Sequence, residues 1–169
     1  MTPPSLGTFK LILAGDGNVG KTRFVRSQGG NYYRQFDNEE KATITKNTNY
    51  GPITFDILET LDSANLSANK DATCAIIMFD VTSRPSYDKV EKWHEDITKV
   101  CGEISTIILG NKVDLNEDTW QITSPEIQIM HSHPVSYFHF SVKSGYNYEK
   151  PLQLLAQKLT GYSDLVITS

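Results

Sequence analysis

The chain has 169 residues, of which 38% are hydrophobic, a length that suits one domain with a full core and is too short for two. Its net charge of −4, with a pI near 5.5, argues against nucleic acid or an anionic membrane as the partner, because no dominant basic field is present. Two cysteines give no disulfide framework, and no signal peptide, lipidation motif or apolar run of ~20 residues occurs, so we expect a soluble, unanchored intracellular monomer.

The first predicted element is a buried strand over residues 9–14, after a loose start over residues 1–8, and a glycine-rich turn follows it at once. The turn fits G-x-x-x-x-G-K-[ST], in which glycines let backbone N–H groups approach a polyphosphate. Lys21 supplies a positive charge, Thr22 offers a hydroxyl to Mg²⁺, and the helix that begins near Lys21 points its positive dipole end at the same place. The predicted phosphate-binding residues are Gly15, Asp16, Gly17, Asn18, Val19, Gly20, Lys21, Thr22 and Arg23.

The next segment, residues 31–50, is polar and tyrosine-rich and has no sustained period, which predicts a mobile loop followed by a short edge strand over residues 43–49. Apolar and polar residues then alternate over residues 53–57, as they do in a half-buried strand. Residues 43–58 are therefore expected to form a hairpin, and the following residues 60–72 a loop or weak helix.

The second half of the chain alternates between strand and helix patterns. Residues 74–79 form an apolar run typical of a strand buried on both faces, and apolar residues three or four apart from Ser86 to Cys101 predict a helix of about four turns. The further predicted elements are a strand over residues 106–109, a short helix from Ser124 to about Met130, a strand over residues 135–141 and a closing helix that stops at Gly161. This order predicts an α/β fold with a mostly parallel, six-stranded sheet flanked by helices, which binds its ligand at the C-terminal ends of the strands.

A second motif, Asn111-Lys112-Val113-Asp114, follows the 106–109 strand. The carboxylate of Asp114 can accept two N–H bonds from the edge of guanine, whereas adenine would leave this acid unpaired at a cost of roughly 1–3 kcal/mol. The backbone of Ser141, Val142 and Lys143, at the end of the last strand, is expected to line the other side of the base. The two motifs together predict a guanine-nucleotide site.

These motifs resemble those of the Ras-type small GTPases, and within that group the chain is most similar to the Ran family. The resemblance extends from about Phe9 to Leu159 and is most specific over residues 74–84, 93–94, 100–101, 110–114 and 146–151. It implies a single P-loop G domain over residues 9–169 that binds GTP or GDP with Mg²⁺ in the nucleus and cytoplasm. It also implies an exchange factor, a GTPase-activating protein and importin-β-type transport receptors as partners.

One segment departs from the family pattern. Where family members have D-T-A-G-Q, this chain has Glu59-Thr60-Leu61-Asp62-Ser63. The resemblance assigns the first residue to Mg²⁺ through water, the glycine N–H to sensing of the γ-phosphate, and the glutamine to the attacking water. Glu59 is then a lengthened metal acid, Asp62 opposes the phosphate charge, and Ser63 is too short to hold the water, so no secure catalytic residue remains. An alternative register makes Asp62 the metal acid and puts Asn65 at the glycine position.

Two other family features also differ. The threonine that the family uses to bind Mg²⁺ beside the γ-phosphate has Thr43 as its candidate here, with Thr45 and Thr48 as rivals. The basic patch of the Ran family is replaced by residues 131–134, and its acidic C-terminal tail does not occur before the chain ends.

Three functions are compatible with these residues. The first is a Ran-like guanine-nucleotide switch in nucleocytoplasmic transport that hydrolyses GTP slowly to GDP and phosphate. The second is a hydrolysis-deficient relative that acts as a nucleotide-locked protein-binding module. The third is a P-loop kinase or ATPase, which Asp114 disfavours because this acid selects guanine.

Overall fold

The computed structural model describes residues 3–34, 40–122 and 135–168, and these form one seven-stranded sheet with the order β2-β3-β4-β1-β5-β6-β7. The strands are β1 (Gly7–Ala14), β2 (Asn31–Arg34), β3 (Glu40–Lys46), β4 (Ile53–Thr60), β5 (Cys74–Asp80), β6 (Ser105–Asn111) and β7 (Val135–His139). The helices are α1 (Lys21–Ser27), α2 (Arg84–Asp88), α3 (Val90–Cys101) and α5 (Lys150–Thr160), with 3₁₀ turns η1 (Ser63–Asn69) and η2 (Glu117–Thr119).

The predicted mostly parallel sheet is confirmed. Strand β1 lies parallel to both β4 and β5, and β5, β6 and β7 continue in parallel, while β2-β3-β4 is an antiparallel ribbon. The expected hairpin is thus β3-β4. Because the parallel strands all run the same way, their C-terminal ends meet at one edge of the sheet, where α/β proteins bind their ligands.

The sheet has seven strands and not the six that the sequence predicts. The additional strand is β2, which lies in the segment interpreted as a loop and pairs with β3. Its tyrosines do not alternate with polar residues, so the pattern of apolar residues gives no strand signal. Each tyrosine hydroxyl instead bonds a carboxylate of β4: Tyr32 donates to Glu59 and Tyr33 to Asp56.

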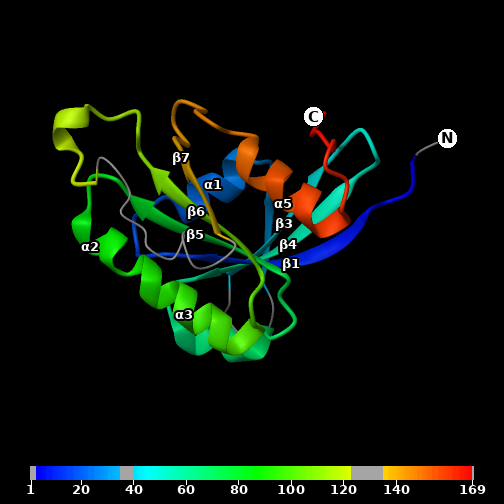
Figure 1. Cartoon of the computed structure of the whole chain (residues 1–169), viewed down its shortest axis with the longest axis horizontal. Coiled ribbons are helices and arrows are strands. Elements are labelled where there is room, and N and C mark those ends of the chain that lie inside the picture. The colour runs from blue at the N-terminus through cyan, green and yellow to red at the C-terminus, as the bar shows by residue number, and fades with distance from the viewer. Residues whose placement is uncertain (1–2, 35–39, 123–134, 169) are drawn as a thin grey trace.

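Helices cover both faces of the sheet (Figure 1). On one face α1 and α5 bury Phe24, Val25, Leu152 and Leu155 against β1, β4 and β5. On the other face, α3 and η1 bury Trp93, Ile97 and Leu66. Every residue of β5 is buried, as its continuous apolar run predicts.

Two helical predictions are refined by the structure. The single helix expected from residue 86 to residue 101 begins earlier, at Arg84, because Ser83 caps it by accepting the N–H of Ser86, with Pro85 in the first turn. It is interrupted at Lys89, which separates α2 from α3. The weak helix over residues 60–72 is the 3₁₀ turn η1. The short helix predicted from Ser124 to Met130 and the residues 131–134 lie outside the described residues. Among the described residues, no helix is long and apolar enough to cross a bilayer.

Candidate nucleotide-binding site

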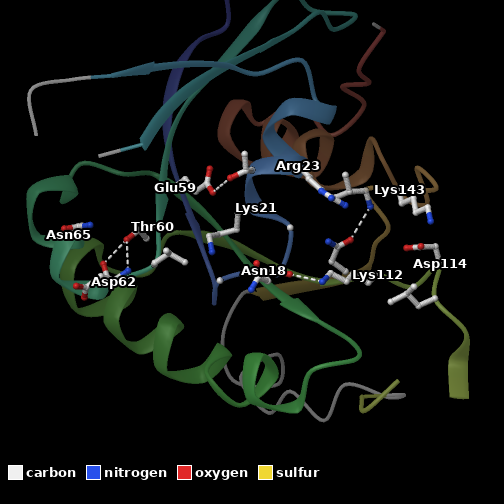
Figure 2. Close-up of a pocket in the computed structure, with 17 residues that line it drawn as sticks. Asn18, Lys21, Arg23, Glu59, Thr60, Asp62, Asn65, Lys112, Asp114 and Lys143 are labelled. Carbon is white, nitrogen blue, oxygen red and sulfur yellow. Dashed lines mark hydrogen bonds between the residues drawn. The ribbon is translucent and has the colours of Figure 1, made fainter. Parts of the chain in front are cut away.

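A pocket of about 1020 Å³ lies at the C-terminal edge of the parallel strands. Figure 2 shows Asp62 and Asn65 toward one end of it, Asp114 and Lys143 toward the other, and Lys21 between them. Of the residues that the sequence predicts to bind nucleotide or metal, the pocket is lined by Gly17, Asn18, Gly20, Lys21, Thr22, Arg23, Glu59, Asn111, Lys112, Asp114, Val142 and Lys143. The two motifs, about ninety residues apart in the chain, therefore face one cavity.

The glycine-rich turn between β1 and α1 has a backbone that side chains would obstruct. Gly15 has a φ of +147°, and a Cβ atom there would collide with the carbonyl of Met78. Gly20 has a φ of +107°, and its Cβ atom would collide with the side-chain amide of Asn111. These two glycines let the loop pack tightly between β5 and β6, and this close packing shapes a cradle of backbone amides.

Lys21, the first residue of α1, is 5% exposed. Its ammonium group donates to the carbonyls of Gly15 at 2.6 Å and Asp16 at 2.8 Å, so the charge is held beside the loop. Burial lowers the pKa of Lys21, while the carboxylates of Glu59 and Asp16 act in the opposite direction. A polyphosphate is the ligand that would compensate this buried positive charge most directly.

Thr22 and Glu59, the residues predicted to bind the metal, are in contact with each other in the pocket. The hydroxyl of Thr22 donates to Glu59 Oε1 at 2.7 Å, which joins the start of α1 to the end of β4 (Figure 2). Tyr32 of β2 donates to Glu59 Oε2 at 2.6 Å. Asp62 makes no such contact with Thr22 among the described hydrogen bonds, so the register in which Glu59 is the metal-side acid agrees with the geometry.

Asn111 joins the phosphate loop to the loop after β7. Its amide nitrogen donates to the carbonyl of Val19 at 2.8 Å, and its amide oxygen accepts the N–H of Val142 at 3.2 Å. The side chain is 3% exposed. Because a buried amide that loses its partners costs about 1–3 kcal/mol, Asn111 fixes the spacing between the two loops.

Asp114 lies at the opposite end of the pocket from Glu59 and is oriented by Ser141. The Ser141 hydroxyl donates to Asp114 Oδ1 at 2.8 Å and accepts the N–H of Ser144 at 2.9 Å. Ser141 itself is fully buried and does not line the pocket. Ser141 therefore acts on the pocket indirectly, because its side chain holds the carboxylate of Asp114. The sequence had predicted that Ser141 lines the base.

Lys112 links the second motif back to the first. Its ammonium donates to the carbonyl of Asn18 at 2.8 Å and pairs with Asp80 Oδ2 at 2.8 Å (Figure 2 shows the Asn18 contact). Burial raises the pKa of Asp80, but hydrogen bonds from Lys112 and Thr82 outweigh it, so the pKa of this carboxyl lies below its usual range. Lys112 is also held at a φ of +73°, a conformation that such contacts must stabilise.

The segment that departs from the family pattern, residues 59–63, leads from β4 into η1. The carboxylate of Asp62 accepts the N–H of Ala64 at 2.9 Å and so caps this turn, while the backbone of Asp62 bonds Thr60. Asp62 lines the pocket, whereas Ser63 is exposed and does not. An acid in this place adds negative charge at the phosphate end of the cavity.

The structure does not bring the predicted switch threonine to the pocket. Thr43 lies in the middle of β3, opposite Asn31 of β2 and Asp56 of β4. Its rivals are also engaged elsewhere, since Thr45 pairs with Thr54 at 2.9 Å and Thr48 donates to the carbonyl of Gly51 at 2.7 Å.

Sequence reasoning missed several lining residues. Thr60, Leu61 and Leu115 contribute to the pocket although none of them was predicted to bind nucleotide, and Asn65, which only the alternative register considers, also lines it. A neighbouring cavity of about 480 Å³ shares Asp114 with the pocket and is bordered by Trp120, His139 and Tyr146, three rings contributed by separate parts of the chain. Thr60 and Leu61 directly follow Glu59, and Leu115 directly follows Asp114, so nearness in sequence to these predicted residues was the available signal.

The residues present fit a nucleotide with Mg²⁺. The phosphate loop is a glycine cradle beside a buried lysine, and Thr22 with Glu59 offers the hard oxygen ligands that Mg²⁺ prefers, with the remaining positions for phosphate and water. Among the described residues, no group of three or more histidine, cysteine or acidic side chains gathers into another metal site.

The strand order and the loop between β1 and α1 define the class of protein: this is a P-loop protein with the Ras-like G-domain fold. The model of the Ras family matches residues 10–161, which is most of the chain. The chain therefore belongs to the Ras family of small GTPases, whose members bind GTP or GDP with Mg²⁺ and act as switches.

Proposed function

We propose that this protein is a guanine-nucleotide switch in which the phosphates bind at Lys21 and the base at Asp114. The observation that carries the proposal is that one pocket has a buried cation near its middle and an oriented carboxylate at one end. A carboxylate held by Ser141 presents acceptor oxygens to the two N–H groups on the guanine edge, which adenine cannot match.

In this proposal the phosphate loop, residues 15–22, surrounds the phosphates with backbone amides, and Arg23 lies at the rim. Asn111, Lys112, Val142 and Lys143 line the base end with Asp114. Mg²⁺ would be held by the hydroxyl of Thr22 and, through water, by Glu59. When bound, the metal would neutralise phosphate charge and orient the terminal phosphates.

We further propose that hydrolysis is slow. The place where the family has a water-positioning glutamine is Ser63, whose hydroxymethyl side chain is too short to reach a water in the pocket and lies outside its lining. Asp62 supplies a negative charge where the family has glycine, which opposes the approach of a γ-phosphate. Together these two residues weaken both turnover and the closure of this segment on GTP.

The cellular role we propose is Ran-like, in nucleocytoplasmic transport, with residence in nucleus and cytoplasm. Its support is the similarity to the Ran family over residues 74–84, 110–114 and 146–151. The predicted partners are importin-β-type receptors, an exchange factor and a GTPase-activating protein. Binding of an importin-β-type receptor to the GTP-loaded chain and not to the GDP-loaded chain would support this role, and equal or absent binding would exclude it.

A nucleotide-locked binding module is the second candidate. It is favoured by the hydrogen bond from the N–H of Ala64 to the carboxylate of Asp62. Because this bond already caps η1, binding or loss of the γ-phosphate would not be expected to change the conformation of Asp62. Such a module would bind guanine nucleotide tightly without measurable turnover.

Chromatography of the nucleotide released from the purified protein tests the proposed function directly. Recovery of GTP would support slow hydrolysis, and recovery of GDP would support a turned-over or GDP-locked state. Recovery of ATP or ADP, or of no nucleotide after loading with excess GDP and Mg²⁺, would contradict the proposal.

A further inference from the structure

We propose that Tyr32 is a positioning residue for the metal-side acid: its hydroxyl fixes the carboxylate of Glu59 so that a lengthened acid still serves the metal. The inference rests on the proposed function, since it concerns the same end of the pocket. It assigns a role to β2, a strand that the sequence motifs do not include.

The first observation is that both carboxylate oxygens of Glu59 accept a hydroxyl from a different element. Thr22 of α1 donates to Oε1 at 2.7 Å, and Tyr32 of β2 donates to Oε2 at 2.6 Å. Two short bonds to two oxygens determine both the position of the carboxylate and the orientation of its plane. With only one of these hydrogen bonds, the carboxylate would be free to rotate about that bond.

The second observation concerns the length of the acid. Glutamate has one more rotatable bond than the aspartate of the family pattern, so more conformational freedom must be lost before its carboxylate is in place. A fixed donor from a neighbouring strand removes that freedom in the folded protein. Tyr32 is thus the contact that compensates for the added methylene at position 59.

The third observation is that Tyr32 is itself held in place. Its ring packs against the core beneath α1 and α5, and the guanidinium of Arg26 lies 5.7 Å from the ring centroid. Its backbone pairs with Ala42 in β3. A donor anchored on three sides can orient its acceptor, which a mobile surface tyrosine cannot do.

The neighbouring residue provides a matched control within the chain. Tyr33 also donates to a carboxylate of β4, Asp56 Oδ1 at 2.5 Å, but it points to the opposite face of the sheet, as successive strand residues do. There it borders a separate cavity of about 110 Å³ with Lys10 and Lys41. Burial and the bond to Asp56 raise the pKa of Tyr33 to about 12.

The test compares Tyr32→Phe with Tyr33→Phe in the full chain. Each variant loses one hydroxyl that bonds a β4 carboxylate and keeps its ring, so both should lose a similar, small amount of thermal stability. The readout is the Mg²⁺ concentration that half-maximally slows release of a fluorescent GDP analogue. Tyr32→Phe should raise this concentration about tenfold, as removal of a residue that orients a metal ligand does, while Tyr33→Phe should leave it within about twofold.

A second pair of variants makes the assignment specific. Glu59→Asp shortens the acid so that it cannot meet both hydroxyls, and Tyr32→Phe in this background should then cause no further shift in the Mg²⁺ requirement. Equal shifts for Tyr32→Phe and Tyr33→Phe, or an undiminished effect of Tyr32→Phe beside Glu59→Asp, would overturn the inference. If the unaltered protein binds GDP with no dependence on Mg²⁺, or binds none, the proposed function fails first.

Discussion

The two ends of the pocket are built differently. At the end that holds Asp114, Ser141 bonds this acid, Asn111 bridges two loops and Lys112 reaches the phosphate loop, so these three side chains each have a fixed partner. At the end where we propose that phosphate and metal bind, the acid is longer than in the family pattern, and Asp62 and Ser63 stand where the family has its sensing and catalytic groups.

This difference shows which parts of such a site tolerate substitution. Contacts between side chains and loop backbone at the base end need a particular amide, hydroxyl or ammonium at a particular distance. At the other end, Thr22 bonds Glu59 although this acid is longer than the aspartate of the family pattern, and each carboxylate oxygen of Glu59 accepts a hydroxyl. We therefore expect this chain to retain nucleotide binding and to hydrolyse GTP slowly.

The largest expected effect falls on Lys21, the buried cation that lies between the two ends. Lys21→Ala should weaken affinity for GDP and GTP about 100-fold, because charge-assisted bonds to two phosphates are worth roughly 3 kcal/mol together. Equilibrium binding of a fluorescent nucleotide measures the change. Lys92→Ala removes the same charge from an exposed ion pair with Asp96 on α3 and should leave affinity unchanged. Equal losses in the two variants would mean that Lys21 is no phosphate ligand.

The next effect concerns the base end alone. Asp114→Ala should reduce the preference for guanine over adenine nucleotides about 30-fold, because the paired N–H groups of guanine lose their acceptor. Competition between GDP and ADP for the loaded protein measures this ratio. Asp118→Ala, an exposed acid in η2 close in sequence, is the matched control and should leave the ratio unaltered. An unchanged ratio in Asp114→Ala would remove the case for guanine.

A gain is expected at the phosphate end. Asp62→Gly combined with Ser63→Gln should raise single-turnover GTP hydrolysis about tenfold or more, because a positioned side chain of sufficient length orients the water and the opposing charge is gone. Release of phosphate from GTP-loaded protein measures the rate. The affinity for GDP should stay near that of the parent. A rate that does not rise would show that these two residues are not what limits hydrolysis.

The smallest expected effect tests whether Ser141 orients the carboxylate of Asp114. Ser141→Ala should weaken guanine nucleotide binding about fivefold, the loss of roughly 1 kcal/mol for one hydrogen bond that orients the Asp114 carboxylate. The control is Ser144→Ala, which removes an exposed hydroxyl three residues later and should leave the affinity for guanine nucleotide unchanged. If Ser141→Ala binds as tightly as the parent, Asp114 does not depend on its neighbour for orientation.

The sequence was sufficient for features that depend on contiguous residues. The phosphate loop, the Asn111–Asp114 motif and the alternation of strands and helices can be identified from spacing alone, since each requires only neighbouring side chains. The sequence allowed two registers for the metal-side acid, and the bond from Thr22 to Glu59, which Asp62 lacks among the described hydrogen bonds, supports the register in which we propose Glu59.

Features that depend on distant partners could not be predicted. Strand β2 is formed from residues without an alternating apolar pattern, and its tyrosines find acceptors 23 and 27 residues later. The bond from Lys112 to Asn18 spans 94 residues. Thr43 was a candidate from the family resemblance and not from a motif in this chain, and its place in the middle of β3 follows from pairing with β2 and β4 that no local pattern reveals.

The place of the two tryptophans has a practical consequence for optical work. Trp93 belongs to α3 and is buried against the face of the sheet opposite α1. Trp120 borders the second cavity, which shares Asp114 with the pocket. Intrinsic emission from Trp120 should therefore respond when a purine occupies the site, against a constant background from Trp93. Loading and exchange of unlabelled nucleotides can then be followed in real time, with Trp120→Phe as the silent reference.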